Sequence, residues 1–219
     1  AHRLREAGHT VTSIGKLHFR SAEDDNGWSE EQIPLHVAEG RGDVLGSIRD
    51  ELVTKPKVRE TVTKAGGGDS SYTRYDQDIT ARAVRWLSEA AQQHTEQSPG
   101  KPWCLFVSLV APHPPLMAPE EFYGMYPHDA VPWPAQATEA EGWPQHPAIA
   151  NYRKAYRFEP AHSPAEIRRA LAAYFGLVSF LDNNVGQLLA ALDTAGLRES
   201  TRVIYTSDHG DNLGNHGLW

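Results

Sequence analysis

Short apolar runs alternate along this chain with longer segments of helical periodicity. Runs rich in β-branched and aromatic residues at 10–14, 103–110 and 202–207 predict three strands. Apolar residues recur at helical spacing over 76–93, which predicts an amphipathic helix. The run at 103–110 is continuously apolar, which is typical of a parallel strand covered on both faces. The order of elements predicts an α/β fold with a mostly parallel central sheet flanked by helices.

A second, longer helix is predicted just before the last strand. Residues 163–166 read Ser-Pro-Ala-Glu, which combines a capping serine, a proline in the first turn and the glutamate of a capping box. Gly196 is a suitable stop, so we expect the helix to run to about residue 193. Gly176 and Gly186 lie inside it and are expected to allow close packing against a neighbour.

The other segments of the sequence have patterns that predict loops, turns and at most short helices. Residues 43–53 could hold one short helix, and 19–42 are polar and predict a surface loop. The glycines within 64–71 lack the spacing of a phosphate-binding loop and predict a turn. Eleven of the 15 prolines fall between Pro112 and Pro164, so we expect a Pro-rich insertion without regular structure at about 112–163.

Both ends of the sequence are abrupt. Residues 1–8 resemble the last turns of a helix, and Trp219 follows a Gly- and His-rich loop. We therefore expect an internal segment of a longer protein, with a complete small domain as the alternative.

Composition and charge exclude several classes of protein. The net charge is −7, whereas proteins that hold nucleic acid by its phosphates usually show a basic excess. No window approaches 18 uninterrupted apolar residues, so no membrane span is expected. Cys104 is the only cysteine, which excludes a disulfide within the chain and a multi-cysteine metal site, and we expect it to be buried. A lone cysteine fits a reducing compartment such as the cytoplasm without requiring one, so localisation stays open.

Reactive side chains follow each predicted strand. Lys16 and His18 come after the first strand, His113 after the second, and Asp208 and His209 after the third. Ligands of open parallel sheets bind outside the carboxyl ends of the strands. If the three strands share one sheet and one direction, all five residues lie on one rim.

Each of these residues also has an ordinary structural interpretation. Lys16 could be a surface lysine, His18 a solvated loop residue, and His113 part of a turn shaped by prolines. Asp208 could cap a turn. Together with His209, however, it offers a carboxylate oxygen and an imidazole nitrogen, both common ligands of divalent metals.

Three motifs, in this order and spacing, resemble those of the sulfatases of the alkaline phosphatase superfamily. They are SIGKLHFRS at 13–21, APHPP at 111–115 and TSDHGDNLGNHGLW at 206–219. A histidine after the metal-ligand aspartate is closer to choline sulfatases and phosphonate monoester hydrolases than to arylsulfatases. The resemblance implies an incomplete alkaline-phosphatase-like fold, with residues 1–219 as the central part of a single catalytic domain.

The resemblance also implies a role for each candidate residue. Lys16 and His18 match residues that contact the sulfate or a hydrated formylglycine nucleophile. His113 matches the histidine that binds sulfate or assists the leaving group. Asp208 and His209 match ligands of one divalent metal ion, for which calcium or manganese is expected. The implied partner is a small-molecule sulfate or phosphonate ester, with no nucleic acid or membrane partner, and a homo-oligomer is left open.

The sequence departs from the family pattern in one important respect. It contains no Cys/Ser-x-Pro-x-Arg motif, in which the family forms its formylglycine. That motif and an early aspartate pair are expected upstream of residue 1, and a further lysine just after Trp219. Asp24 and Asp25 come too late in the order to replace the early pair. The expected function is metal-dependent hydrolysis of sulfate esters by the full-length protein, with this segment inactive alone.

Three alternatives remain at this point. One is a phosphonate monoester or phosphodiester hydrolase on the same fold, and another is a catalytically inactive sulfatase-like module. The third is a serine hydrolase using Ser108, His113 and Asp208. The sequence has no Gly-x-Ser-x-Gly elbow, and Ser108 lies within a predicted strand, which argues against the third.

Overall fold

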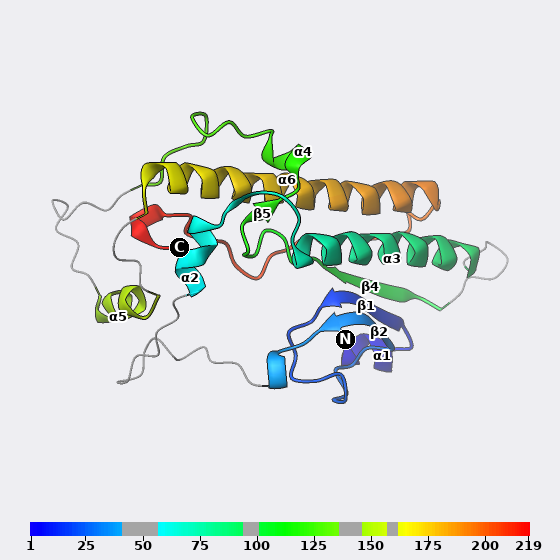
Figure 1. The fold of residues 1–219 in the computed structure, drawn as a ribbon. Coiled ribbons are helices and arrows are strands. Elements are labelled where there is room, and N and C mark those ends of the chain that lie inside the picture. Colours follow the sequence, from blue (N-terminus) through cyan, green and yellow to red (C-terminus); the bar gives the residue numbers. More distant parts are fainter. Residues whose placement is uncertain (41–56, 94–100, 136–145, 157–161) are drawn as a thin grey trace. The chain divides into compact units, whose positions relative to one another are not determined.

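The computed structural model contains two compact units. Figure 1 labels its helices and strands. The described residues are 1–40, 57–93, 101–135, 146–156 and 162–219. The short helix expected at 43–53 lies outside them. The first unit contains α1 (His2–Glu6), β1 (Thr10–Lys16), β2 (Glu30–Leu35), a 3-10 turn η1 (Ala38–Gly40), α3 (Ser71–Gln93) and β4 (Trp103–Ser108). The second contains α2 (Lys57–Thr63), β3 (Gly66–Gly67), β5 (Met117–Ala118), α4 (Glu120–Tyr123), α5 (Pro147–Tyr156) and a 3-10 turn η3 (Asn215–Gly217). Helix α6 (Pro164–Thr194) contributes to both.

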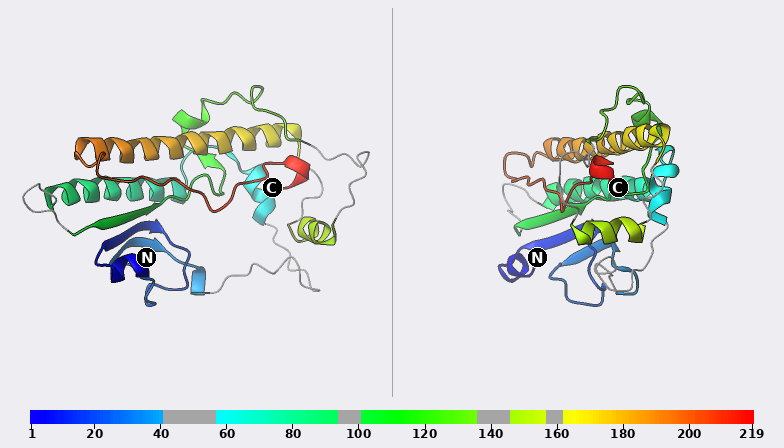
Figure 2. Two further views of the ribbon diagram at one scale, coloured as in Figure 1. Left: turned by 180° about the vertical axis from the view of Figure 1, so that it is seen from behind. Right: turned by 90° about the vertical axis from the view of Figure 1, so that its left-hand side faces the viewer.

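A parallel sheet with the order β2-β1-β4 forms the centre of the first unit. Strands β1 and β4 pair from Thr10 opposite Trp103 to Gly15 opposite Ser108. The first two predicted strands are therefore confirmed as parallel neighbours, and their carboxyl ends lie at the same edge of the sheet. The views in Figure 2 show α1 and α3 on opposite sides of this sheet.

The predicted apolar stripe of α3 is confirmed as the face that covers the sheet. Ile79 and Ala83 are fully buried and pack with Ile14 of β1. Leu87, one turn further along, packs with Leu192 near the end of α6. The helix begins at Ser71, five residues earlier than the pattern predicted, because its first turns carry polar residues that give no apolar signal.

Two predictions about the sheet are wrong. Residues 19–42 are not all loop, because β2 pairs in parallel with β1 at the sheet edge, where Pro34 and a shift in register are tolerated. Strand β4 is half-buried rather than covered on both faces, because it is the other edge strand of the described sheet. Cys104 is accordingly half-buried, and Phe106 is 41% exposed.

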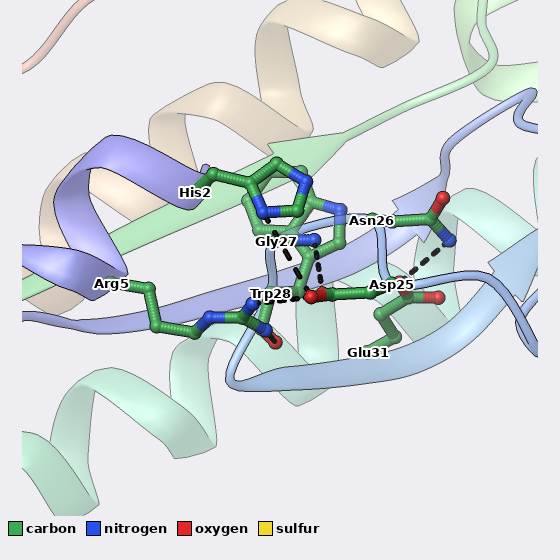
Figure 3. A network of polar contacts seen from close by, with 7 residues as sticks. All are labelled: His2, Arg5, Asp25, Asn26, Gly27, Trp28 and Glu31. Carbon is green, nitrogen blue, oxygen red and sulfur yellow. Dashed lines mark hydrogen bonds and ion pairs between the residues drawn. The ribbon is translucent and has the colours of Figure 1, made fainter.

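Helix α1 is fastened to the loop before β2 by a polar network around Arg5 (Figure 3). The Arg5 guanidinium donates to Asp25 Oδ2 at 2.7 Å and to the Trp28 carbonyl at 3.0 Å. The Gly27 amide donates to Asp25 Oδ1 at 3.0 Å. The hydrogen bond from Arg5, followed by that from Gly27, lowers the pKa of Asp25 to about 2.

The core of the second unit is formed by small and branched residues of several short elements packed on α6. Its buried members are Val62, Ala65, Leu116, Ala118, Ala170, Ala173 and Leu177. The glycines predicted as a turn pair instead with β5 as a two-residue parallel strand. Arg169 of α6 donates to the carbonyls of Thr63 and Ala65, both at 2.8 Å, so it holds the connection between α2 and β3.

The predicted start and stop of α6 are confirmed. Glu166 accepts from both the amide and the hydroxyl of Ser163 at 2.8 Å, and Gly196 has a φ of +67° just past the helix end. A Cβ at Gly176 would lie 2.9 Å from the Ala118 side chain, so the expected close approach is present there. Nothing lies within 4 Å of a Cβ at Gly186, so the same expectation is wrong for that residue.

Two further predictions fail in the later part of the chain. The Pro-rich insertion includes a regular helix, α5, because residues 148–156 are free of proline and rich in helix formers. Residues 202–207 are not a strand, and Ile204 is 81% exposed. An extended segment becomes a strand only when it pairs with another, and none of the described strands pairs with this one. Among the described helices, none combines the length and apolarity needed to cross a bilayer.

Candidate functional site

Lys16 is the last residue of β1 and leaves the sheet beside the end of β4. The residue as a whole is half-buried. The preceding Gly15 has a φ of +107°, and a Cβ there would collide with the Ser108 carbonyl of β4. Glycine thus allows the two strands to approach closely at the point where Lys16 emerges.

His18 lies in a turn that is held by the end of β2. Its amide donates to the Leu35 carbonyl at 2.9 Å, and the Leu17 amide shares that acceptor at 3.2 Å. The backbone of His18 has a φ of +57°, and its imidazole is exposed. The Gly-Lys-x-His motif is therefore placed at one sheet edge by pairing on both sides of β1.

The exit from β4 is fixed by a buried carboxylate that sequence reasoning assigned only to the start of a helix. Asp76 of α3 is fully buried, and its two oxygens accept the amides of Val110 and Ala111, both at 2.8 Å. Burial raises the pKa of Asp76 to about 6, against the lowering effects of the two amides and of Lys16. The available signal was its position on the apolar stripe, three residues before Ile79, where a carboxylate is unexpected.

His113 follows this exit by two residues and belongs to the second unit. Its ring is exposed, and Nδ1 lies 2.7 Å from the Pro114 carbonyl. Because a carbonyl only accepts hydrogen bonds, this contact places a proton on Nδ1. In the neutral ring the lone pair is then on Nε2, the nitrogen suited to exchange a proton with a substrate.

Asp208 and His209 are exposed neighbours in the second unit. Asp208 Oδ1 accepts the His209 amide at 2.9 Å, and Oδ2 lies 3.7 Å from His209 Nε2. His209 Nδ1 is 3.0 Å from the Gly210 carbonyl, which only accepts, so in the neutral ring Nε2 carries the lone pair.

A carboxylate oxygen and an imidazole nitrogen at this spacing fit a divalent metal ion. They are two donors, whereas such ions take four or more. Within the described part of the chain, no three His, Cys, Asp or Glu side chains gather around one point suited to a metal. The pair therefore supplies at most part of a metal site.

The loop after this pair is packed into the second unit. Asp211 accepts a hydrogen bond from Tyr174, whose pKa is raised first by burial and then by that carboxylate. Gly214 has a φ of +84°, and a Cβ there would lie 2.7 Å from the Trp219 ring. Asn215 Oδ1 accepts the Ala135 amide at 2.7 Å. Gly214 thus allows this loop to pack closely against Trp219.

The five candidate residues thus stand in two groups. Lys16 and His18 share the sheet edge of the first unit, whereas His113, Asp208 and His209 belong to the second unit. Their convergence on one rim stays a prediction.

Comparison with known proteins places this chain among its relatives. The family model described as Sulfatase matches residues 1–219, the whole chain. The chain belongs to the sulfatase family. This confirms the resemblance seen in the three sequence motifs, and it assigns the chain to the alkaline phosphatase superfamily.

Individual relatives agree with this assignment. A choline-sulfatase of Rhizobium meliloti (strain 1021) is 29% identical over 230 residues, covering 100% of this sulfatase-family chain and 43% of that protein. An iduronate 2-sulfatase of Homo sapiens is 30% identical, covering 99% of this chain and 40% of that protein.

A solved structure shows the same fold. The phosphonate monoester hydrolase SpPMH from Silicibacter pomeroyi aligns with a TM-score of 0.57 at 20% identity, covering 99% of this chain and 48% of that one. The likeness confirms the predicted α/β fold with a parallel sheet flanked by helices. This chain spans less than half the length of these three proteins.

Proposed function

We propose that residues 1–219 are the central part of a single catalytic domain that hydrolyses sulfate esters with the help of a divalent metal ion. The observation that carries the proposal is the sheet edge where Lys16 emerges beside the exit of β4, two residues before His113. Membership of the sulfatase family supports it.

The chemistry of the candidate residues suits a sulfate ester. The sulfuryl group is a tetrahedral anion, and cleavage of its ester bond spreads negative charge over its oxygens and the leaving oxygen. Lys16 and His18 would donate hydrogen bonds to the sulfuryl oxygens. His113, with Nδ1–H bonded to the Pro114 carbonyl, would act in its imidazolium form, donating the Nε2 proton to the leaving oxygen and keeping the Nδ1 proton. Positive side chains that are fixed in place stabilise such charge without having to reorganise during the reaction.

Asp208 and His209 would hold the metal ion through Oδ2 and Nε2, the atoms that lie 3.7 Å apart. When bound, a calcium or manganese ion would add positive charge next to the sulfuryl oxygens. These two side chains would supply two of the ligands that such an ion takes. Asp208 fixes the His209 amide, so the two ligands are oriented together.

We propose further that this chain by itself does not turn over sulfate esters. Its sequence lacks the Cys/Ser-x-Pro-x-Arg motif in which the family forms a formylglycine nucleophile. Purified chain incubated with para-nitrophenyl sulfate and calcium or manganese is expected to match a metal-only blank. Turnover above that blank would contradict this expectation.

The experiment that tests the proposed function is a substrate panel on the full-length protein. We expect kcat/KM for sulfate monoesters to exceed that for phosphonate monoesters and phosphodiesters with the same leaving group. A preference for phosphonates by orders of magnitude would contradict sulfate ester hydrolysis. It would favour the second candidate, a phosphonate monoester hydrolase, which the fold of the neighbour from Silicibacter pomeroyi supports. Absence of turnover on the whole panel would favour an inactive sulfatase-like module.

A further inference from the structure

Asp76 differs from the other carboxylates singled out above by its burial. Its side chain is fully buried in the face of α3 that covers the sheet, and it lies among apolar residues such as Ile79. A buried carboxylate is costly unless it is hydrogen-bonded. Both of its oxygens are satisfied by backbone amides rather than by a side chain of the core.

The two amides that it binds lie beyond the sheet. Pairing between β1 and β4 ends with Gly15 opposite Ser108, so Val110 and Ala111 have passed the last register position of the ladder. Each amide is 2.8 Å from one oxygen of Asp76. The Asp76 carboxylate thus takes the place of the hydrogen bonds between strands and fixes the backbone at Val110 and Ala111. The next residue, Pro112, has no amide hydrogen, and His113 follows it.

The same carboxylate interacts electrostatically with Lys16, the cation of the proposed site. Lys16, at the end of β1, is the charged group whose field acts on Asp76. On its own helix, Tyr75 and Asp78 are the neighbouring titratable groups. Asp76 therefore binds the exit of β4 that leads to His113, and it interacts electrostatically with Lys16 at the exit of β1.

We propose that Asp76 is a positioning residue of the anion site, fixing the path of the chain into His113 and balancing the charge of Lys16. This inference rests on the proposed function. Asp76 itself does not contact the substrate in this account, because both of its oxygens are occupied by the Val110 and Ala111 amides.

The test compares Asp76→Asn with Asp78→Asn in the full-length protein. An amide group at 76 would turn one acceptor into a donor facing the amide of Val110 or Ala111. Asp78 is an exposed carboxylate on the same helix that bonds Arg82 at 3.0 Å, so its variant controls for loss of a charge from α3.

For Asp76→Asn we expect kcat on para-nitrophenyl sulfate to fall by about tenfold to a hundredfold, with KM changed by less than about threefold. Binding of orthovanadate, which mimics the five-coordinate transition state, should weaken by at least about tenfold. Asp78→Asn should keep both wild-type values. If Asp76→Asn has the same kcat per folded molecule as the wild-type protein, whatever its thermal stability, Asp76 has only a structural role and the inference is overturned.

Two further measurements keep the inference testable. If the wild-type protein turns over no ester, the proposed function fails. The role of Asp76 is then tested by measuring vanadate binding with calorimetry. Equal vanadate affinity in the wild-type protein and Asp76→Asn overturns the inference. If Asp76→Asn does not fold, hydrogen exchange of the wild-type protein decides. Protection of the Val110 and Ala111 amides supports the inference, and exchange as fast as in exposed loops overturns it.

Discussion

Three aspartates of this chain differ in what surrounds their carboxylates, and the surroundings set their chemistry. Asp25 is exposed but bonded to Arg5, so it stays ionised down to an acidic pH. Asp76 is buried, and its pKa is raised to about 6. Asp208 is exposed and bonded to the amide of the histidine that follows it. Of the three, only Asp208 is proposed to share a metal ion with a neighbouring side chain.

Substitutions of Asp208 and of His113 should differ in their effect on the metal content of the protein. Asp208→Ala removes a proposed ligand, so metal content and activity are expected to fall together. His113→Ala should reduce turnover by about 10²–10⁴-fold while metal is retained, because its proposed role is proton transfer. Atomic absorption of the purified full-length variants and kinetics on para-nitrophenyl sulfate measure both. Unchanged metal content in Asp208→Ala would remove Asp208 from the site, and loss of metal in His113→Ala would make His113 a ligand.

The network around Arg5 predicts a pH-dependent contribution to stability. The pKa of Asp25 is lowered from 3.8 to about 2 in the folded chain, so the folded state favours its ionised form. This contribution is present above about pH 4 and is lost as the pH falls towards 2. Asp25→Asn should therefore lower the melting temperature at neutral pH, with the difference shrinking between pH 4 and pH 2.

Glu199→Gln, which changes an exposed carboxylate beyond the end of α6, is the control for this measurement. It should leave the melting temperature unchanged over the same pH range. A difference between Asp25→Asn and wild type that persists undiminished at pH 2 would contradict the assignment of the Arg5 bond.

At the scale of elements, the sequence predicted what local pattern controls. The apolar stripe of α3, the capping box of α6 and the runs that form β1 and β4 follow from residues close in sequence. Strand β2 could not be predicted, because EEQIPL has no strand pattern and becomes a strand only by pairing with β1. The run at 202–207 shows the reverse, because strand-like residues without a pairing partner stay extended and exposed.

For the candidate site, as for the secondary structure, the sequence predicted local features but not contacts between distant residues. The parallel pairing of β1 and β4 bears out the prediction that these two strands are neighbours in one sheet, whereas the gathering of the candidate residues at its edge stays a prediction. The position of Asp76 at the exit of β4 could not be predicted, because its two hydrogen bonds join residues that are 34 and 35 positions apart in the sequence. The pattern offered only an aspartate near a helix start, which usually indicates a favourable charge at the N-terminus.

Helix α6 offers a matched pair of glycines for a stability test. A Cβ at Gly176 would meet Ala118 at 2.9 Å and the Tyr123 backbone at 3.1 Å, whereas a Cβ at Gly186 meets nothing within 4 Å. Gly176→Ala should therefore destabilise the protein by about 1–3 kcal/mol. Gly186→Ala should stabilise it by about 0.5–1 kcal/mol, because alanine loses less backbone entropy in a helix.

Urea unfolding of the two glycine variants of the full-length protein measures both effects, each as a change in the free energy of unfolding. Equal effects of the two substitutions would contradict the close approach of α6 to β5 and α4 at Gly176.

At the scale of the whole molecule, the fold and the family are established, whereas the joint site is proposed. The chain is a sulfatase-family α/β segment that spans less than half the length of its relatives. Its candidate residues are divided between two units, with Lys16 and His18 in one and His113, Asp208 and His209 in the other. Sulfate ester hydrolysis as proposed assigns all five to a single anion.

A crystal structure of the full-length protein with bound inorganic sulfate and its metal ion tests that assignment most directly. The account predicts one sulfate within hydrogen-bonding distance of Lys16, His18 and His113, and one metal ion coordinated by Asp208 and His209 beside it. A sulfate bound elsewhere, with Lys16 and Asp208 too far apart to share one anion, would contradict it.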